Sequence, residues 1–180
     1  MKKIYIIVSN SNTITSKILK YITKEKYVHV SISLDKNLKE AYSFGRRYIY
    51  SPIPGGFINE EYVIRCKHFN KSISKIYELE IDYKKYNNLK KELENKYKRY
   101  NKKYKYNYRG LYFIQFNKIY HRDYHYLCSQ FCGKLLIDNK IMDFKKDYSL
   151  IKPKDFLDLN YTNLIFEGKT IDYLKIRKRV

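Results

Sequence analysis

The stretch Tyr126-Leu127-Cys128-Ser129-Gln130-Phe131-Cys132-Gly133-Lys134-Leu135-Leu136 decides the fold of this 180-residue chain. Leu127, Phe131 and Leu135 recur at every fourth position, which predicts one apolar face of a buried helix. Cys128 lies in the first turn, where unpaired backbone N–H groups and the positive end of the helix dipole favour an anion. A thiolate is such an anion, and the same N–H groups can stabilise an oxyanion beside the sulfur. The competing interpretation is a small buried hydrophobe, the usual role of a free cysteine.

The composition is that of a globular chain with a single core. The hydrophobic fraction is 44%, with only 6 Gly and 3 Pro, which excludes a disordered chain. A length of 180 residues is enough for one domain with a substantial core. Because no internal repeat or linker interrupts the sequence, we expect one domain over residues 1–180.

The charge is strongly positive but selects no partner by itself. The formal net charge is +20, with 38 Lys plus Arg. Such a balance favours nucleic acid, an anionic membrane face or an anionic polymer as partner. The chain is also rich in Lys, Ile, Asn and Tyr together, with 22 Tyr, and a genome biased towards A and T produces the same enrichment.

The cysteine count and the hydropathy pattern point to a cytoplasmic protein. Three cysteines form no disulfide framework, which fits a reducing compartment. The apolar run Ile4–Val8 is too short for a signal peptide, and no stretch reaches the length of a membrane span.

Strand and helix patterns occur in separate runs, which predicts an α+β fold with an antiparallel sheet. Strands are expected at Ile4–Val8, Tyr27–Leu34, Leu38–Phe44, Tyr62–Cys66, Ile76–Ile81, Asn163–Phe166 and Thr170–Ile176. Helices are expected at Thr13–Thr23, from Asp82 to Arg109, at Cys128–Ile137 and, as a short turn, at Pro153–Leu157. The Pro- and Gly-rich stretch Ser51–Phe57 is expected to be a loop.

His29 is a candidate base. It lies in an alternating strand pattern, on the side opposite Val28, Val30 and Ile32. A histidine on an exposed strand face is usually ordinary. A catalytic base also needs a third group that fixes its tautomer and stabilises its charged form, so the next strand has to supply a polar neighbour.

The turn after this strand determines which residue that neighbour is. With a tight turn at Asp35–Lys36, the cross-strand neighbour of His29 is Tyr42 and that of Ser31 is Glu40, on the same face of the sheet. Glu40 is therefore the candidate orienting residue. A turn one residue longer switches the face and makes Ser43 the neighbour, and the sequence leaves the register open.

Five blocks of the sequence together resemble the circularly permuted branch of the NlpC/P60 superfamily, which includes the YiiX-like proteins. The blocks are Tyr27–Asp35, Tyr42–Arg46, Gly55–Phe57, Cys128–Phe131 and Lys152–Asp155. The resemblance extends from Ile4 to about Tyr173 and implies a papain-like α+β fold in which the histidine precedes the cysteine along the chain.

The resemblance also implies roles for three residues. Cys128 matches the nucleophile and His29 the general base, while Glu40 matches the third polar residue with one residue fewer in the turn. It implies a cysteine peptidase or amidase that transfers an acyl group through a thioester, without a cofactor or metal. The expected substrate is a peptide or an acyl amide. The superfamily also contains deamidases and acyltransferases.

A zinc site is the first alternative for the same region. His121, His125, Cys128 and Cys132 are residue types that bind zinc. All four crowd into residues 121–132, whereas structural zinc sites prefer closer cysteine pairs separated by a loop. We therefore expect no metal site and a core position for Cys132.

Two further alternatives are a basic binding module without catalysis and a membrane-peripheral acyl hydrolase or acyltransferase. The Lys- and Tyr-rich stretch Lys84–Arg109 resembles a surface for single-stranded nucleic acid. Its tyrosines fall at helical spacing, however, which predicts that they face the core, and no nucleic-acid motif is present. The basic surface and the aromatic stretch Ile53–Ile58 favour an anionic membrane.

Overall fold

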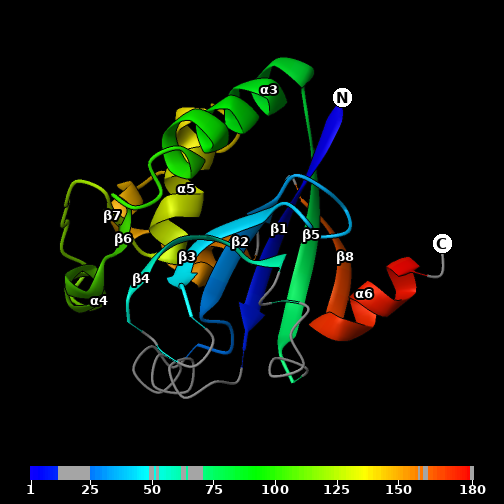
Figure 1. The fold of residues 1–180 in the computed structure, drawn as a ribbon, viewed down its shortest axis with the longest axis horizontal. Helices are drawn as coiled ribbons and strands as arrows, with labels where there is room; N and C mark the ends of the chain where they lie inside the picture. Colours follow the sequence, from blue (N-terminus) through cyan, green and yellow to red (C-terminus); the bar gives the residue numbers. More distant parts are fainter. Residues whose placement is uncertain are drawn as a thin grey trace.

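The computed structural model describes residues 1–11, 25–48, 51, 53–61, 64, 71–157, 159 and 162–178. Within these ranges the chain forms one eight-stranded sheet in the order β7-β6-β4-β3-β2-β1-β5-β8 (Figure 1). Neighbouring strands are antiparallel except for the parallel pair β6 and β7. The expected α+β class with an antiparallel sheet is confirmed.

The described residues form β-strands, α-helices and shorter helical segments. The strands are β1 (Lys2–Asn10), β2 (His29–Ser33), β3 (Ala41–Arg46), β4 (Gly55–Asn59), β5 (Ile73–Ile81), β6 (Lys105–Tyr106), β7 (His125–Tyr126) and β8 (Asn163–Lys169). The α-helices are α3 (Tyr83–Glu92), α4 (Tyr108–Gln115), α5 (Cys128–Asp138) and α6 (Thr170–Lys178). A π-helical segment η2 (Leu93–Lys98) and the 3-10 turns η3 (Tyr148–Leu150) and η4 (Pro153–Phe156) complete them. Among the described residues, no helix combines the length and the apolar character needed to cross a bilayer.

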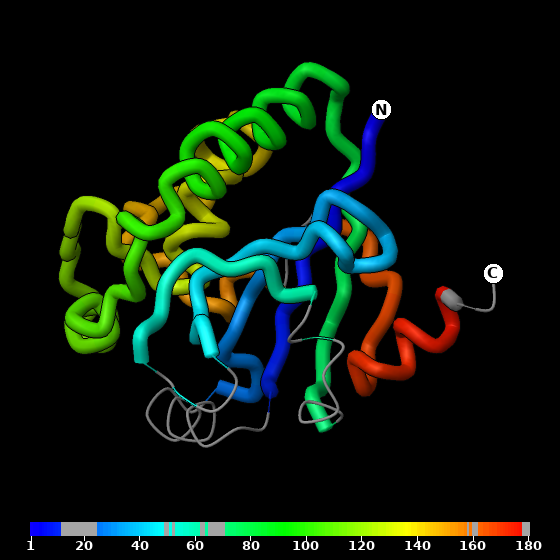
Figure 2. Tube along the Cα trace, viewed as in Figure 1, coloured from blue at the N-terminus to red at the C-terminus, as the bar shows by residue number. Residues whose placement is uncertain are grey.

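Helix α5 is the centre of the larger core, as the cysteine-containing stretch predicts. Leu127, Phe131 and Leu135 are all buried, and α5 packs against β2 and β3. Complete burial of a Leu or Phe side chain contributes about 1.5–3 kcal/mol each. A side chain at Gly133 would clash with Ile151, so the glycine allows the segment after η3 to lie directly on the helix. Figure 2 shows how the chain brings α5, in yellow, beside the blue β2 despite their separation in sequence.

The opposite face of the sheet has a smaller core. Tyr5 and Ile7 of β1 pack there with Tyr173 and Leu174 of α6. Strand β1 is therefore apolar on both sides, which explains its continuous hydrophobic run. The expectation of a strand over Thr170–Ile176 is wrong, because residues three and four positions after Thr170 share one helical face and are buried together.

The turn between β2 and β3 is longer than the sequence suggested. Asp35 Oδ1 accepts the N–H of Asn37 at 2.8 Å and Oδ2 accepts the N–H of Glu40 at 2.6 Å, which ties the loop into a compact unit. Strand β3 consequently begins at Ala41, and Ile32 pairs with Tyr42. The tight turn at Asp35–Lys36 is therefore wrong, as is the placement of Tyr42 opposite His29.

The stretch Ser51–Phe57 is only partly a loop, because β4 already begins at Gly55. A side chain at Gly56 would clash with the carbonyl oxygen of Tyr104, and one at Gly55 would lie 2.8 Å from Tyr106 Cβ. The two glycines therefore signal a close approach of β6 to β4 rather than a turn.

The helix after Asp82 starts where expected and ends early. Asp82 accepts the N–H of Lys85 at 2.8 Å as its N-cap, but helical structure stops at Lys98 rather than continuing to Arg109. The expected strands at Ile4–Val8, Tyr27–Leu34, Ile76–Ile81 and Asn163–Phe166, and the turn at Pro153–Leu157, are all present. The predicted helix Thr13–Thr23 and most of the predicted strand Tyr62–Cys66 lie outside the described residues.

Candidate active site

The first turn of α5 is fixed by polar side chains that bond to the backbone of other segments. Gln130 Oε1 accepts the N–H of Leu127 at 3.0 Å, and its Nε2 donates to the carbonyl of Ser149 at 2.9 Å. Ser129 Oγ donates to the carbonyl of Ile151 at 2.6 Å. These buried bonds hold the start of the helix, and with it Cys128, in one position.

Cys128 is the first residue of α5 and only 4% of its surface is exposed. The N–H groups of the first helical turn have no carbonyl partner within the helix. At the start of α5 these groups include the N–H of Cys128 itself and that of Ser129. An oxyanion that forms at this position would accept hydrogen bonds from groups already in place.

His29 begins β2, and the residue after it anchors this strand to α5. The carbonyl of Val30 accepts Ser43 Oγ at 2.7 Å and the Cys132 thiol at 3.6 Å. Cys132 is completely buried, so its predicted core position is confirmed. Because Cys132 lies one turn after Cys128, this contact places the beginning of β2 against the beginning of α5.

The structure brings Cys128 and His29 together. Burial of the imidazole lowers the pKa of His29, but the charge of Glu60, followed by the charge and hydrogen bonding of Cys128, outweighs it. The net result is a pKa for His29 well above its ordinary value. The site therefore favours the charged, imidazolium form of His29 between the Glu60 carboxylate and the Cys128 sulfur.

Glu60, and not Glu40, is the carboxylate that contacts His29. Its Oε1 bonds to Nε2 of the imidazole, and its side chain is 7% exposed. Glu60 follows β4 directly, and its own N–H donates to the carbonyl of Ala41 at 2.7 Å. The extended pairing of β4 with β3 thus delivers the carboxylate to the histidine.

The three residues proposed from sequence as partners of His29 have other contacts. Glu40 lies 3.9 Å from Lys98 Nζ and is 39% exposed, so its assignment as orienting residue is wrong. Tyr42 stacks on Phe57 with ring centroids 5.7 Å apart, and Ser43 bonds to β2 as described above. The sequence alone could have indicated Glu60 only as an acidic residue at the end of a strand. Its contact with His29 depends on the register of β2, β3 and β4.

The residues of the alternative zinc site are dispersed among other partners. His121 Nε2 bonds to Asp147, and His125 Nδ1 donates to the carbonyl of Asp123 at 2.7 Å. In the part of the chain that the structure describes, no group of three or more His, Cys, Asp or Glu side chains could hold a metal ion. Cys66 and His68 lie outside it.

The Lys- and Tyr-rich stretch contributes to the core, as its spacing predicts. Tyr97 and Tyr104 are 0% and 3% exposed and pack together at 4.8 Å between ring centroids. Tyr100 is 44% exposed. Two of the tyrosines that a nucleic-acid interpretation would use are therefore unavailable for base stacking.

No protein-family model, curated protein or solved structure matches this chain. The chemistry of the protein has to be inferred from the site itself.

Proposed function

We propose that the protein is a cysteine hydrolase with a papain-like fold of the permuted NlpC/P60 type, acting on an amide through a thioester. Cys128 is the nucleophile, His29 the general base and Glu60 the orienting residue. One observation carries the proposal: a cysteine at a helix start and a histidine from a distant strand share a site in which a buried carboxylate binds the second nitrogen of the imidazole.

The arrangement assigns a step to each group. Because Glu60 occupies Nε2, Nδ1 is the nitrogen available for the thiol proton. The thiolate attacks the amide carbon, and the N–H groups at the start of α5 stabilise the oxyanion. The amine leaves with the proton from His29. Water then gives a proton to His29 and attacks the thioester, which releases the acid and restores the thiol.

A purely structural role explains this pair less well. A buried carboxylate and imidazole lose hydration, and an apolar pair of similar volume often stabilises a core equally well. Perturbed titratable groups next to a nucleophile are typical of functional sites. The raised pKa of His29, with Cys128 among its causes, therefore favours chemistry over packing.

Alkylation by iodoacetamide at pH 6, followed by peptide mass spectrometry, tests the proposal. An ordinary thiol with a pKa near 8.5 is less than about 1% thiolate at this pH. We expect Cys128 to react at least about tenfold faster than Cys132, because His29 lies beside its thiol and can take the proton, whereas Cys132 is a completely buried core residue.

Two variants control this measurement. Cys132→Ala should leave the labelling of Cys128 unchanged, whereas His29→Asn should slow it. Equal and slow labelling of Cys66, Cys128 and Cys132 in the unmodified protein would contradict the proposed function.

A further inference from the structure

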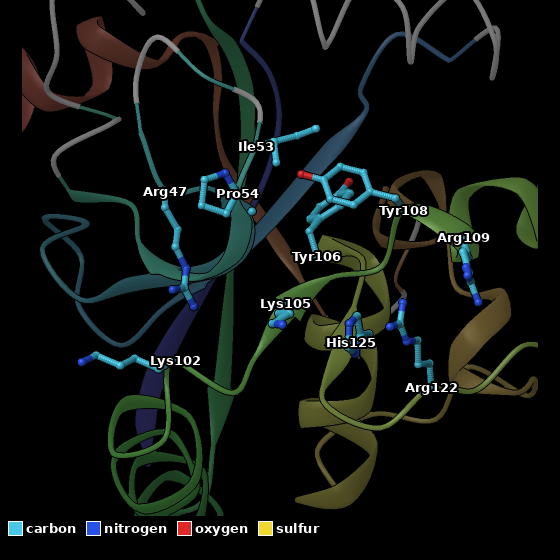
Figure 3. A pocket seen from close by; sticks show the side chains of 11 residues that line it. Arg47, Ile53, Pro54, Lys102, Lys105, Tyr106, Tyr108, Arg109, Arg122 and His125 are labelled. Carbon is cyan, nitrogen blue, oxygen red and sulfur yellow. The ribbon is translucent and has the colours of Figure 1, made fainter.

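A basic pocket of about 400 Å³ is lined by β6 and by residues of the segments around it (Figure 3). Its basic side chains come from the segment after β3, the segment after η2, β6, α4, the segment before β7 and β7 itself: Arg47, Lys102, Lys105, Arg109, Arg122 and His125. Tyr106 and Tyr108 supply an aromatic wall, with ring centroids 5.0 Å apart. None of the lining residues is acidic, so the pocket has a positive potential.

Three connections place the pocket next to the reacting groups. Tyr106 lies close enough to Cys128 that the charge of the sulfur, after burial, raises the pKa of its phenol. Gly56 of β4 pairs with Lys105 of the pocket on one side and with Gly45 of β3 on the other. Gly45 in turn lies close to the histidine, because a side chain at this position would be 3.8 Å from His29 Cε1. The pocket and the catalytic pair thus share the β3–β4–β6 part of the sheet.

The positive charges of the pocket have few compensating groups. Among the described residues, no ion pair neutralises Lys102, Lys105, Arg109 or Arg122. Arg47 donates from Nη2 to the carbonyls of Asn101 and Tyr104, at 2.6 and 2.9 Å. Its buried Nε has no hydrogen-bond partner in the described structure. A ligand with several acceptor oxygens would satisfy these donors.

We propose that this pocket binds a phosphoryl group of the substrate and holds it while the scissile carbonyl reaches Cys128. The binding step stands on the pocket alone, and only the second half rests on the proposed hydrolase function. A phosphate matches the planar fork of arginine and accepts bonds from several directions. A single carboxylate would offset less of the positive charge of the lining residues. A soluble phosphate ester and a phospholipid headgroup share this chemistry.

The full-length Cys128→Ala variant allows binding to be measured without turnover. Isothermal titration with glycerol 3-phosphate tests the soluble source, and co-sedimentation with phosphatidylglycerol vesicles, compared with phosphatidylcholine vesicles, tests the headgroup. In this background, Lys102→Gln with Arg122→Gln removes two exposed cations from the pocket. Lys84→Gln with Lys91→Gln removes the same charge from exposed positions outside it.

We expect the pocket pair to weaken binding about tenfold or more, since each lost charge-assisted hydrogen bond is worth close to that factor, and the control pair to leave it nearly unchanged. Binding in the titration identifies a soluble phosphate ester, and binding to phosphatidylglycerol vesicles alone identifies a headgroup. Either result supports the proposal if the pocket pair of substitutions weakens that binding and the control pair does not. Equal losses in both pairs, no binding in either arm, or tighter binding of a single-stranded oligonucleotide would overturn it. If the pocket binds as expected but Cys128 is not selectively alkylated, the hydrolase function fails and the phosphate site remains.

Discussion

Two of the histidines that the structure describes bind a carboxylate, and their surroundings differ. His29 pairs with Glu60, and the side chains are 27% and 7% exposed. His121 pairs with Asp147 at 2.9 Å, and the exposed fractions there are 50% and 26%. The first pair lies beside the cysteine at the start of α5, whereas His121 stacks on the ring of Tyr148 with centroids 4.8 Å apart.

The comparison shows that the chemical role of a His–carboxylate pair depends on the group next to the histidine and on how deeply the pair is buried. Charges interact more strongly where water is excluded, so Glu60 and Cys128 raise the pKa of His29 well above its usual value against the effect of burial. At Asp147, burial raises the pKa of the carboxyl, but hydrogen bonds from Ser149 and His121 bring it below its usual value. This second pair caps the turn η3 and lies beside Ser149 and Tyr148 rather than beside a cysteine.

The largest difference between the pairs should appear when each histidine is replaced by asparagine. His29→Asn removes the general base, and such groups contribute about 10²–10⁴-fold to rate. We expect alkylation of Cys128 at pH 6, and hydrolysis of any amide substrate found, to fall steeply. His121→Asn removes an exposed pair and should leave both rates unchanged. Similar losses in the two variants would mean that the His29 pair has no special role.

Replacing each of two glutamates by glutamine sharpens the assignment of the orienting residue. Glu60→Gln keeps the shape of the side chain and removes its charge, so the pKa of His29 should fall towards its ordinary value. Glu40→Gln, which alters the carboxylate near Lys98, should not change it. A ¹H–¹³C NMR titration of the imidazole Cε1–H group measures both.

The same shift has a consequence for stability. Since the pKa of His29 is raised on folding, its pair with Glu60 contributes fully below the unfolded value of about 6.5 and is lost as pH rises through the folded value. In Glu60→Gln this loss should occur at lower pH. An unchanged titration of His29 in that variant would exclude Glu60 as its main electrostatic partner.

Local patterns in the sequence were sufficient for the elements that contain the two reacting residues. The four-residue spacing of Leu127, Phe131 and Leu135 predicts α5, because residues four positions apart lie on the same face of a helix. The strand with His29 follows from its alternating residues. The order of strand and helix patterns is enough for the α+β class.

The third site residue could not be predicted in the same way. Glu40 was selected on the assumption of a tight turn, but the Asp35 side chain supports a longer one and shifts the register. Glu60 reaches His29 because it directly follows β4. The glycines of β4 suggested a loop, since nothing in the local sequence indicates that β6 approaches them closely. Thr170–Ile176 was mistaken for a strand because its packing against β8 and the smaller core, rather than a local pattern, selects the helix. The errors at β4 and α6 share one cause, which is contact between residues distant in sequence, whereas the error at the turn comes from the local bonds of the Asp35 side chain.

The smallest expected effect concerns the His121 pair and stability alone. Asp147 Oδ1 accepts the N–H of Ser149 at 2.8 Å at the start of η3, so Asp147→Ala should lower the free energy of unfolding by about 1 kcal/mol. Asp147→Asn keeps a capping oxygen and loses only the partly exposed ion pair, which is worth at most about 1 kcal/mol. Because the pKa of Asp147 is lowered on folding, the contribution of its charge exists above the unfolded pKa and disappears as pH falls through the folded one. Urea unfolding at pH 7 and pH 3 should therefore show a difference in the free energy of unfolding between the unmodified protein and Asp147→Asn that is smaller at pH 3.

The same variant tests whether the two histidine pairs are coupled. Alkylation of Cys128 in Asp147→Asn should proceed at the rate of the unmodified protein. A slower rate would mean that the pairs are coupled through η3, because the Ser149 carbonyl accepts a hydrogen bond from the Gln130 side chain at the start of α5.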